Sequence, residues 1–282
     1  MLRRVLREVI RQETADEFTV SVVVADNDAE RSAEAVVAEV AGTTSTQIRN
    51  CVEPRQNIAL ARNMVVSNAT GDYLAFIDDD EFPIPTWLLT LFHLCRERNV
   101  DGVLGPVLRH FDQTPPVWLE KSDLYVRPIK PTGTDVIWHE ARTGNVFLKR
   151  ELVLGDSMPF RPEFRAGEDK DFFRRKIDEG RKFIWCAEAV VYETVPPARW
   201  KRKYLWRKAL LRGASAGLQT NWKSVLKSCI ALPLYTFGLP FALIAGQHYF
   251  VTLVMKLCDH LGKLLILVGI NPVRGEYVLD QP

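Results

Sequence analysis

The feature that most constrains the fold is a stretch, Gly71 to Phe82, in which a short apolar run leads directly into acidic residues (GDYLAFIDDDEF). Tyr73 to Ile77 have the length and side chains of a buried strand. The next four residues, DDDE, are all acidic. Carboxylates this close repel one another unless a cation or a cationic partner lies beside them. The stretch therefore predicts a strand that ends at a charged site.

Two of these aspartates, Asp78 and Asp80, would point to one side of an extended chain and Asp79 to the other. Hard divalent ions such as Mg²⁺ or Mn²⁺ take oxygen ligands and often bridge substrate phosphates. An Asp-x-Asp pair can thus hold a metal and a nucleotide ribose at the carboxyl edge of an α/β sheet, and we count Asp79 among the nucleotide-binding residues. The alternative is a solvated acidic turn, which Pro83 and the preceding apolar strand disfavour.

Strands and helices alternate over roughly the first 107 residues, which predicts an α/β fold with a mostly parallel sheet flanked by helices. Strands are expected at residues 18–25, 47–52, 73–77, 100–107, 146–148 and 183–192. Helices are expected at residues 2–12, 32–40, 57–69, 86–97 and 172–179. The irregular, proline-rich segment from residue 108 to 131 is typical of a functional loop.

Composition narrows the class of protein. The chain has 282 residues, 47% hydrophobic and 26% charged, as in globular proteins, and its net charge of +2 suggests no nucleic-acid partner. The five widely spaced cysteines, without a CxxC, indicate reduced thiols in a cytosolic setting. The basic amphipathic start has no apolar core segment, so no signal peptide is expected.

The C-terminal part is apolar. From Ser228 to Met255 no Asp, Glu, Lys or Arg occurs, and such a run is long enough to cross a bilayer. Prolines and glycines interrupt it, so a re-entrant or interfacial hairpin fits as well as a single span, and a pair of helices buried against the globular part is a third alternative. The basic segment Arg199 to Lys208 fits a solvated helix face or a surface that meets a membrane or phosphates. If the tail meets the inner membrane, the basic flank up to Lys227 places the catalytic part on its cytoplasmic side. We therefore expect a domain at residues 1–217 and an apolar helical tail at residues 218–282.

A second acidic cluster, Glu168, Asp169 and Asp171, precedes a predicted helix. Helix N-termini stabilise carboxylates by about 0.3–1 kcal/mol, which by itself explains acidic residues there. Two separate clusters also permit two separate tasks. One can hold a metal-bound diphosphate while a carboxylate of the other takes a proton from an attacking hydroxyl.

Three further polar residues lie near predicted strand ends or on a helix. Asp26 and Asn27 follow a β-branched strand and can hydrogen-bond a base or ribose, or simply form a turn. Arg62 can pair with a phosphate or base, or lie in solvent as an ordinary helix arginine.

The ordered motifs resemble bacterial family-2 glycosyltransferases of the GT-A fold, in particular exopolysaccharide enzymes of the succinoglycan glucosyltransferase type. The resemblance covers about Leu2 to Gly217 and rests on ADND, ARN, ATGDYLAFIDDDEFP, TGNVFLKREL and GEDKDFFRRKIDEG. It implies an inverting transfer from a nucleotide-diphosphate sugar, with UDP as the expected nucleotide. The acceptor would be a hydroxyl of a lipid-linked or polysaccharide molecule.

The resemblance also implies roles for the acidic motifs. It places Mg²⁺ or Mn²⁺ at the Asp-x-Asp motif, with Asp80 as the direct ligand and Asp78 as the ribose or metal partner. It makes Asp169 the general base, with Glu168 beside it.

Four other residues also acquire roles from the resemblance. Asp26 and Arg62 would recognise the nucleotide, and Gly144 and Asn145 would line the donor-sugar and acceptor pocket.

One departure from the family pattern concerns the start of the chain. Family members open with a strand before the helix that begins here at Leu2, so we expect the sheet to lack its first strand. A second departure is Glu193, which stands near the place of a metal-binding histidine in many GT-A enzymes.

Three other functions are considered beside a glycosyltransferase, and the missing first strand favours one of them. The first is a truncated, non-catalytic GT-A module that binds nucleotide or a partner. A metal-dependent phosphoesterase is disfavoured because no histidine adjoins the acidic clusters, and a membrane-structural protein would not need those clusters.

Overall fold

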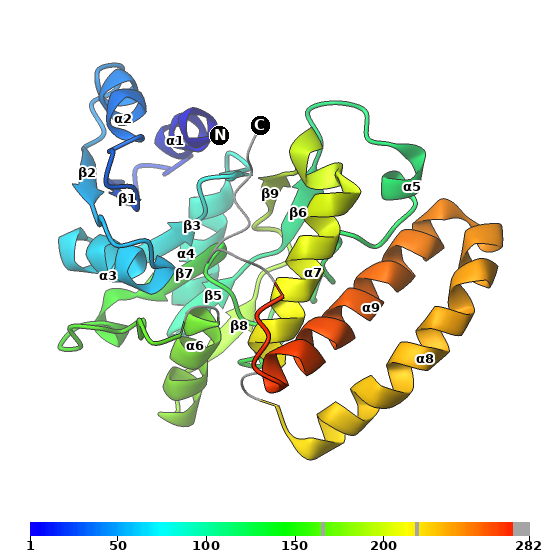
Figure 1. Ribbon diagram of the computed structural model, residues 1–282. Helices are drawn as coiled ribbons and strands as arrows, with labels where there is room; N and C mark the ends of the chain where they lie inside the picture. The colour runs from blue at the N-terminus through cyan, green and yellow to red at the C-terminus, as the bar shows by residue number, and fades with distance from the viewer. Residues whose placement is uncertain (165–166, 218–219, 273–282) are drawn as a thin grey trace. The chain divides into compact units, whose positions relative to one another are not determined.

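The computed structural model describes residues 1–164, 167–217 and 220–272 (Figure 1). The chain divides into two compact units, one formed by residues 1–110 and 127–194 and the other by residues 111–126 and 195–282. The division differs from the expected boundary after residue 217, because residues 195–217 group with the apolar tail.

The first unit contains strands in three small sheets. β1 (Val22–Asp26) pairs in parallel with β2 (Ile48–Val52). A second sheet has the order β3 (Tyr73–Ile77), β7 (Asn145–Lys149), β5 (Gly102–Leu104) and β8 (Phe183–Trp185). A third has the order β4 (Glu81–Pro83), β9 (Val191–Thr194) and β6 (Val107–His110).

The helices of this unit lie close to their predicted positions. They are α1 (Leu2–Ile10), α2 (Glu34–Ala41), α3 (Ile58–Asn68), α4 (Trp87–Glu97) and α6 (Glu168–Asp178), with the short 3₁₀ turn η1 (Arg150–Leu152). Asn57 begins α3 as predicted, because its side chain accepts hydrogen bonds from the amides of Ala59 and Leu60. α6 begins at Glu168, four residues earlier than expected, so its acidic residues form the first turn.

The α/β class is confirmed, but two of the three sheets combine parallel and antiparallel pairs, so the strands are not mostly parallel. β7 runs antiparallel to both of its neighbours, β3 and β5. The expected strand at residues 100–107 is two strands, β5 and β6, which lie in different sheets and are separated by Gly105 and Pro106. The chain packs tightly at this point, since a side chain at Gly105 would collide with the backbone of Ala189 and with Asn145. The expected strand at 183–192 also divides, and its halves β8 and β9 lie in different sheets.

The core of the first unit lies on both faces of the β3–β7–β5–β8 sheet. Phe147 of β7 packs with the apolar side of α4, including Trp87 and Leu91. Val146 and Leu148, the alternate residues of β7, pack on the other face with aromatic residues of α6. The sheet is therefore sandwiched between helices, which fixes the strand ends where the acidic residues lie.

The β1–β2 pair remains a separate sheet. Among the described residues no strand precedes β1, as the expectation of a missing first strand requires.

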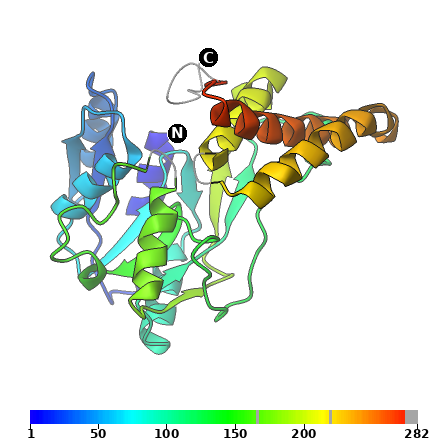
Figure 2. The same cartoon turned by 60° about the horizontal axis from the view of Figure 1, so that its bottom comes forward.

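The second unit is helical. It consists of α5 (Val117–Glu120), the 3₁₀ turn η2 (Pro197–Trp200), α7 (Arg202–Gly217), α8 (Trp222–Ala245) and α9 (Gln247–Leu267). α9 packs between α7 and α8 (Figures 1 and 2). α7 and α9 can approach closely because Gly213 and Gly262 have no side chains. A Cβ atom at either position would collide with the backbone of Asp259 or Leu210. In the described part of the chain, α8 is the helix long and apolar enough to cross a membrane.

Candidate functional site

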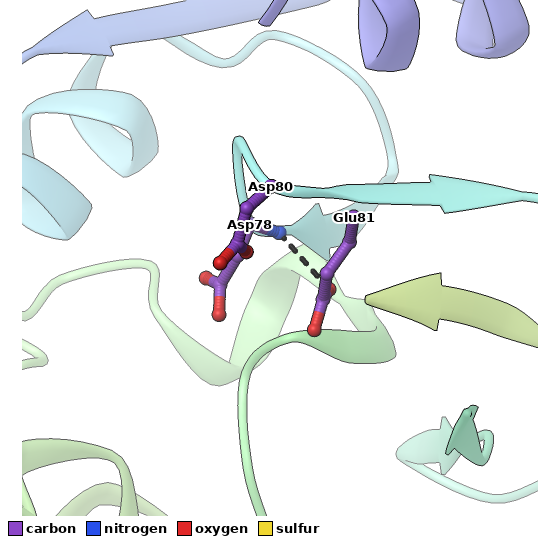
Figure 3. A group of neighbouring side chains, drawn as sticks. All are labelled: Asp78, Asp80 and Glu81. Carbon is purple, nitrogen blue, oxygen red and sulfur yellow. Dashed lines mark hydrogen bonds between the residues drawn. The ribbon is translucent and has the colours of Figure 1, made fainter. Parts of the chain in front are cut away.

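The acidic cluster predicted from the sequence forms at the turn between β3 and β4. Ligand oxygens of Asp78, Asp80 and Glu81 lie within 4.8 Å of one another (Figure 3). The Asp78 amide donates to the Glu81 carboxylate at 3.2 Å, and the Glu81 amide donates to the Asp78 carbonyl at 3.1 Å. The amide of Thr194, at the end of β9, donates to the Asp80 carbonyl at 2.8 Å. Asp79 is exposed between the two aspartates.

Burial makes this cluster electrostatically unusual. Glu81 is only 3% exposed, and its burial, reinforced by Asp78, raises its pKa well above the ordinary value. The surrounding protein atoms raise the pKa of Asp78 to about 6, although its side chain retains solvent contact; Arg62 opposes this shift. A bound cation would offset both penalties, and carboxylate oxygens are the donors that Mg²⁺ and Mn²⁺ take. The residues present therefore fit a hard divalent ion.

Gly144 lies against this cluster. A Cβ atom there would come within 2.6 Å of a Glu81 carboxylate oxygen and 3.2 Å of an Asp78 carboxylate oxygen. The reason is the pairing of β7 with β3, which places Asn145 opposite Ile77. The chain can pass the cluster only without a side chain at this position.

Arg62 of α3 connects the two acidic clusters. Its guanidinium forms an ion pair with Glu168, and its Nη2 lies 3.8 Å from Asp78 Oδ1. The Arg62 side chain is 11% exposed, so it is not a solvated helix arginine. Burial raises the pKa of Glu168, and the charge of Arg62 opposes that rise. Residues far apart in the sequence thus form one site.

Asp169, next to Glu168, keeps partial solvent exposure in the first turn of α6. Its Oδ1 accepts a hydrogen bond from the Lys170 amide at 2.7 Å. Burial, reinforced by the nearby Arg127, lowers the pKa of Arg142, and the charges of Asp169, Glu193 and Glu81 oppose that shift. Arg142 is therefore a second arginine within electrostatic range of carboxylates of both acidic clusters.

Asp26 and Asn27 lie where β1 ends, as predicted, but make structural contacts there. Asp26 is 5% exposed and accepts a hydrogen bond from the Ala33 amide at 2.8 Å. The Asn27 amide donates to the carbonyls of Glu53 and Arg55 at 2.8 and 2.7 Å. Asn27 thus holds the loop between β2 and α3.

The side chain of Asn145 also makes structural hydrogen bonds. Its Oδ1 accepts from the Trp87 indole at 2.8 Å, and its Nδ2 donates to the carbonyls of Pro106 and Ala189 at 2.9 and 2.8 Å. Because these bonds use both ends of the buried amide, Asn145 joins β7 to two neighbouring loops. Its contribution to the site is to position the adjacent Gly144.

Sequence reasoning gave no site role to three charged residues, Glu81, Arg127 and Arg142. Glu81 was visible in the DDDE run but was not assigned as a ligand. Arg127 pairs with Glu193 at 2.5 Å, and Glu193 lies opposite Glu81 in the antiparallel β4–β9 pair. The proximity of these residues, and of Arg142, depends on strand register and loop path, so no local motif could have revealed it.

The fold defines the class of protein. S. aureus TarS (residues 1–349, crystallised with UDP) superposes with a TM-score of 0.54 at 14% identity, over 95% of this chain and 88% of that one. GalNAc-T7, crystallised with UDP, GalNAc and Mn²⁺, superposes with a TM-score of 0.52 at 13% identity, over 73% of this chain and 44% of that one. The architecture is the GT-A glycosyltransferase fold.

The sequence comparisons define the family. The model of glycosyl transferase family 2 matches residues 1–160. The chain is 34% identical over 240 residues to the succinoglycan biosynthesis protein ExoM of Rhizobium meliloti (strain 1021), covering 80% of this chain and 76% of that protein. The chain belongs to glycosyltransferase family 2, and the predicted resemblance is confirmed.

Proposed function

We propose that this protein is an inverting glycosyltransferase that moves a sugar from a nucleotide-diphosphate sugar, with UDP as the nucleotide, to a hydroxyl of a lipid-linked or polysaccharide acceptor. One observation carries the proposal: Arg62 pairs with Glu168, the neighbour of the predicted base Asp169, and lies near Asp78 of the acidic cluster. TarS was crystallised with UDP and with UDP-GlcNAc, and ExoM is named for succinoglycan biosynthesis, which supports these donor and product classes.

On the donor side, Asp80, Asp78 and Glu81 would hold Mg²⁺ or Mn²⁺, which when bound neutralises charge on the leaving diphosphate. Because Gly144 has no side chain, its backbone passes directly beside these carboxylates, and in this proposal that backbone lines the donor-sugar pocket. Arg62 is oriented by its ion pair with Glu168 and offers its remaining N–H groups to the nucleotide.

The other nucleotide-binding residues lie at strand ends of the same unit. Asp79 is exposed beside the cluster and is a donor contact in this proposal. Asp26 lies buried at the end of β1, and Asn27 and Asn145 act by positioning the backbone around the donor.

On the acceptor side, Asp169 accepts the proton of the attacking hydroxyl. As the acceptor oxygen bonds to the anomeric carbon, the bond from that carbon to the diphosphate oxygen breaks, and its electron pair leaves with the nucleoside diphosphate. Attack from the face opposite the leaving group inverts the configuration. Glu168 is less suited to this step, because its buried carboxylate is held by Arg62, so we assign it to positioning Arg62 and the first turn of α6.

We place the reaction at the cytoplasmic face of the inner membrane, where a lipid-linked acceptor would be presented. The apolar helix α8 and the product class in the name of ExoM support this location.

The test is to measure nucleotide release from a panel of nucleotide-diphosphate sugars with Mn²⁺ or Mg²⁺, using a membrane lipid extract as acceptor. We expect turnover with one donor, loss of turnover in Asp80→Asn, and a product with inverted anomeric configuration by NMR. A retained configuration would contradict the proposed step. Absence of turnover, with thermal stabilisation by UDP and Mn²⁺ preserved, would instead support the non-catalytic nucleotide-binding module.

A further inference from the structure

The outer face of α8 carries a continuous row of large apolar side chains, here called the α8 stripe. Its members recur every three or four residues and are between 52% and 86% exposed: Trp222, Leu226, Ile230, Leu234, Phe237, Phe241 and Ile244. That spacing places them on one side of a helix. The opposite side, which includes the buried Ser228 and Ala231, packs against α9.

Such a row is unusual for a surface that meets only water. Scattered exposed apolar residues are normal, but a contiguous patch along a 24-residue helix indicates an interaction site. Within the second unit, α9 covers only the inner side of α8, as Figure 2 shows.

We propose that the α8 stripe lies in the plane of an anionic lipid bilayer, with its apolar side chains in the interface and the helix parallel to the membrane. The charge of the surrounding chain supports a lipid partner. Residues 195–258 include no Asp or Glu and ten basic residues: Arg199, Lys201, Arg202, Lys203, Arg207, Lys208, Arg212, Lys223, Lys227 and Lys256. Lys223 and Lys227 lie on α8 itself, whereas the basic residues from Arg199 to Arg212 lie at η2 and α7. Lysines beside an apolar helix face match the headgroups of anionic lipids.

The first turns of α8 show this arrangement most clearly. Lys223 and Lys227 are exposed beside the stripe, and the Lys223 ammonium lies 5.8 Å from the Trp222 ring centre. Trp222 is 70% exposed. Tryptophan and lysine side chains favour the headgroup level of a membrane, so this end would anchor the helix at the interface.

Polar contacts on the side of α8 that packs against α9 indicate that α8 does not cross the bilayer. The His260 Nδ1 atom of α9 lies 2.9 Å from Ser228 Oγ, and Lys263 Nζ donates to Ser224 Oγ at 2.8 Å. α9 is tied in turn to α7, where Arg212 pairs with Asp259 at 2.6 Å. A spanning α8 would draw these polar and charged groups towards hydrocarbon, which is costly. In-plane docking buries the stripe and leaves the contacts with α9 unchanged.

The same charges argue against a second copy as the occupant. Face-to-face packing of two stripes would bring together two α8 helices whose charged residues, Lys223 and Lys227, are all basic. Like charges across an interface disfavour association. An anionic bilayer satisfies both the stripe and its basic surroundings.

The experiment is cosedimentation of the full chain with vesicles of phosphatidylcholine, with or without 30% phosphatidylglycerol. It uses no nucleotide sugar, so its outcome is independent of catalysis. We expect binding to the anionic vesicles and at least about tenfold weaker binding for Phe237→Ser/Phe241→Ser. The matched control is Ile129→Ser/Leu154→Ser, which changes two exposed apolar residues of the first unit and should bind like wild type. Replacement of Lys223 and Lys227 by Gln should weaken binding to anionic vesicles by about fivefold for each lysine.

Four results would overturn the proposal. They are failure of the wild type to bind either vesicle, equal loss in the Ile129/Leu154 control, retention of the protein on vesicles after an alkaline carbonate wash, and a dimer that dissociates in Phe237→Ser/Phe241→Ser without a change in vesicle binding. The carbonate result would indicate a span, and the dimer result a second copy. Thermal unfolding of each variant verifies that the exposed replacements leave the protein folded.

Discussion

The two units of this chain treat charge and apolar surface in opposite ways. In the first unit, the carboxylates of Glu81 and Glu168 are 3% and 4% exposed, and arginines lie near them. In the second unit, residues 195–258 have no carboxylate, and apolar side chains such as Phe237, 79% exposed, face outward. Each arrangement is unfavourable in water by itself, so each indicates the chemistry of what it binds.

The comparison also separates two ways of holding a site. The acidic site depends on a few long-range contacts of charged side chains, so single substitutions should have large and local effects. The α8 stripe depends on summed apolar area, and its rigidity depends on how closely α9 packs against α7. The predictions below begin with the largest expected effect.

The largest effect is expected for the proposed general base, Asp169. Asp169→Asn keeps the size of the side chain but cannot accept a proton, so kcat should fall by about 10²–10⁴-fold while UDP binding is unchanged. Steady-state kinetics and calorimetric titration with UDP measure the two quantities. The matched control is Asp178→Asn on the same helix, whose side chain is 68% exposed and should turn over normally. Full activity of Asp169→Asn would exclude it as the base.

Arg62→Met tests whether the two acidic clusters form one site. The change leaves Glu168 buried without its cationic partner, and the free energy of unfolding should fall by about 3 kcal/mol, measured with urea. Arg62→Met/Glu168→Gln should recover more than half of that loss, because it removes the uncompensated charge. Arg174→Met breaks an exposed pair with Asp178 and should cost only about 0.5 kcal/mol. Similar losses for both arginines would show that the buried pair is not special.

Gly262→Ala probes the packing that supports α8 in the second unit. The added Cβ would collide with the Leu210 backbone, and overpacking of this kind costs about 1–3 kcal/mol of unfolding free energy. Gly238→Ala is the matched control, since its Cβ would meet only the end of the Leu253 side chain, at 3.2 Å. The greater helix propensity of alanine should make that variant neutral or stabler by up to about 1 kcal/mol. Equal stabilities in urea unfolding would mean that the close α7–α9 contact is not required.

The smallest expected effect is a pH dependence at Asp78. Its pKa in the folded protein is raised from 3.8 to about 6, so without metal its contribution to stability is present below pH 4 and is lost as the pH rises through 6. A metal ion requires the carboxylate, so Mn²⁺ affinity should fall by about tenfold for each pH unit below 6. Thermal shift titrations with Mn²⁺ at pH 5, 6 and 7 measure this. Asp78→Asn should bind Mn²⁺ more weakly and lose the pH dependence near 6; an unchanged profile would mean that another group controls it.

Much of the local structure was predictable. The Tyr73–Ile77 strand has the predicted bounds, and Asn57 begins its helix as expected. The acidic run and the Glu168–Asp169 pair were also recognised as local clusters, whereas the role of Gly144 came from the family resemblance and stays a prediction. The predictions of the helices and strands succeed because hydrophobic period and helix caps act within a few residues of one another.

Other features depended on contacts between distant segments. The antiparallel entry of β7 between β3 and β5 brings Gly144 to the cluster, and no pattern near Gly144 specifies that direction. The pairing of Arg62 with Glu168 joins residues 106 positions apart. The regrouping of residues 195–217 with the tail follows from the packing of α7 on α9.

The sequence by itself thus determined the family, the alternation of strands and helices, the two acidic clusters and the apolar character of the tail. Only the tertiary structure decided that Arg62 connects those clusters, that Asn27 and Asn145 support the backbone, and that one face of α8 stays exposed. The physical reason is that local chemistry selects each element, whereas strand register and helix packing decide which distant side chains meet.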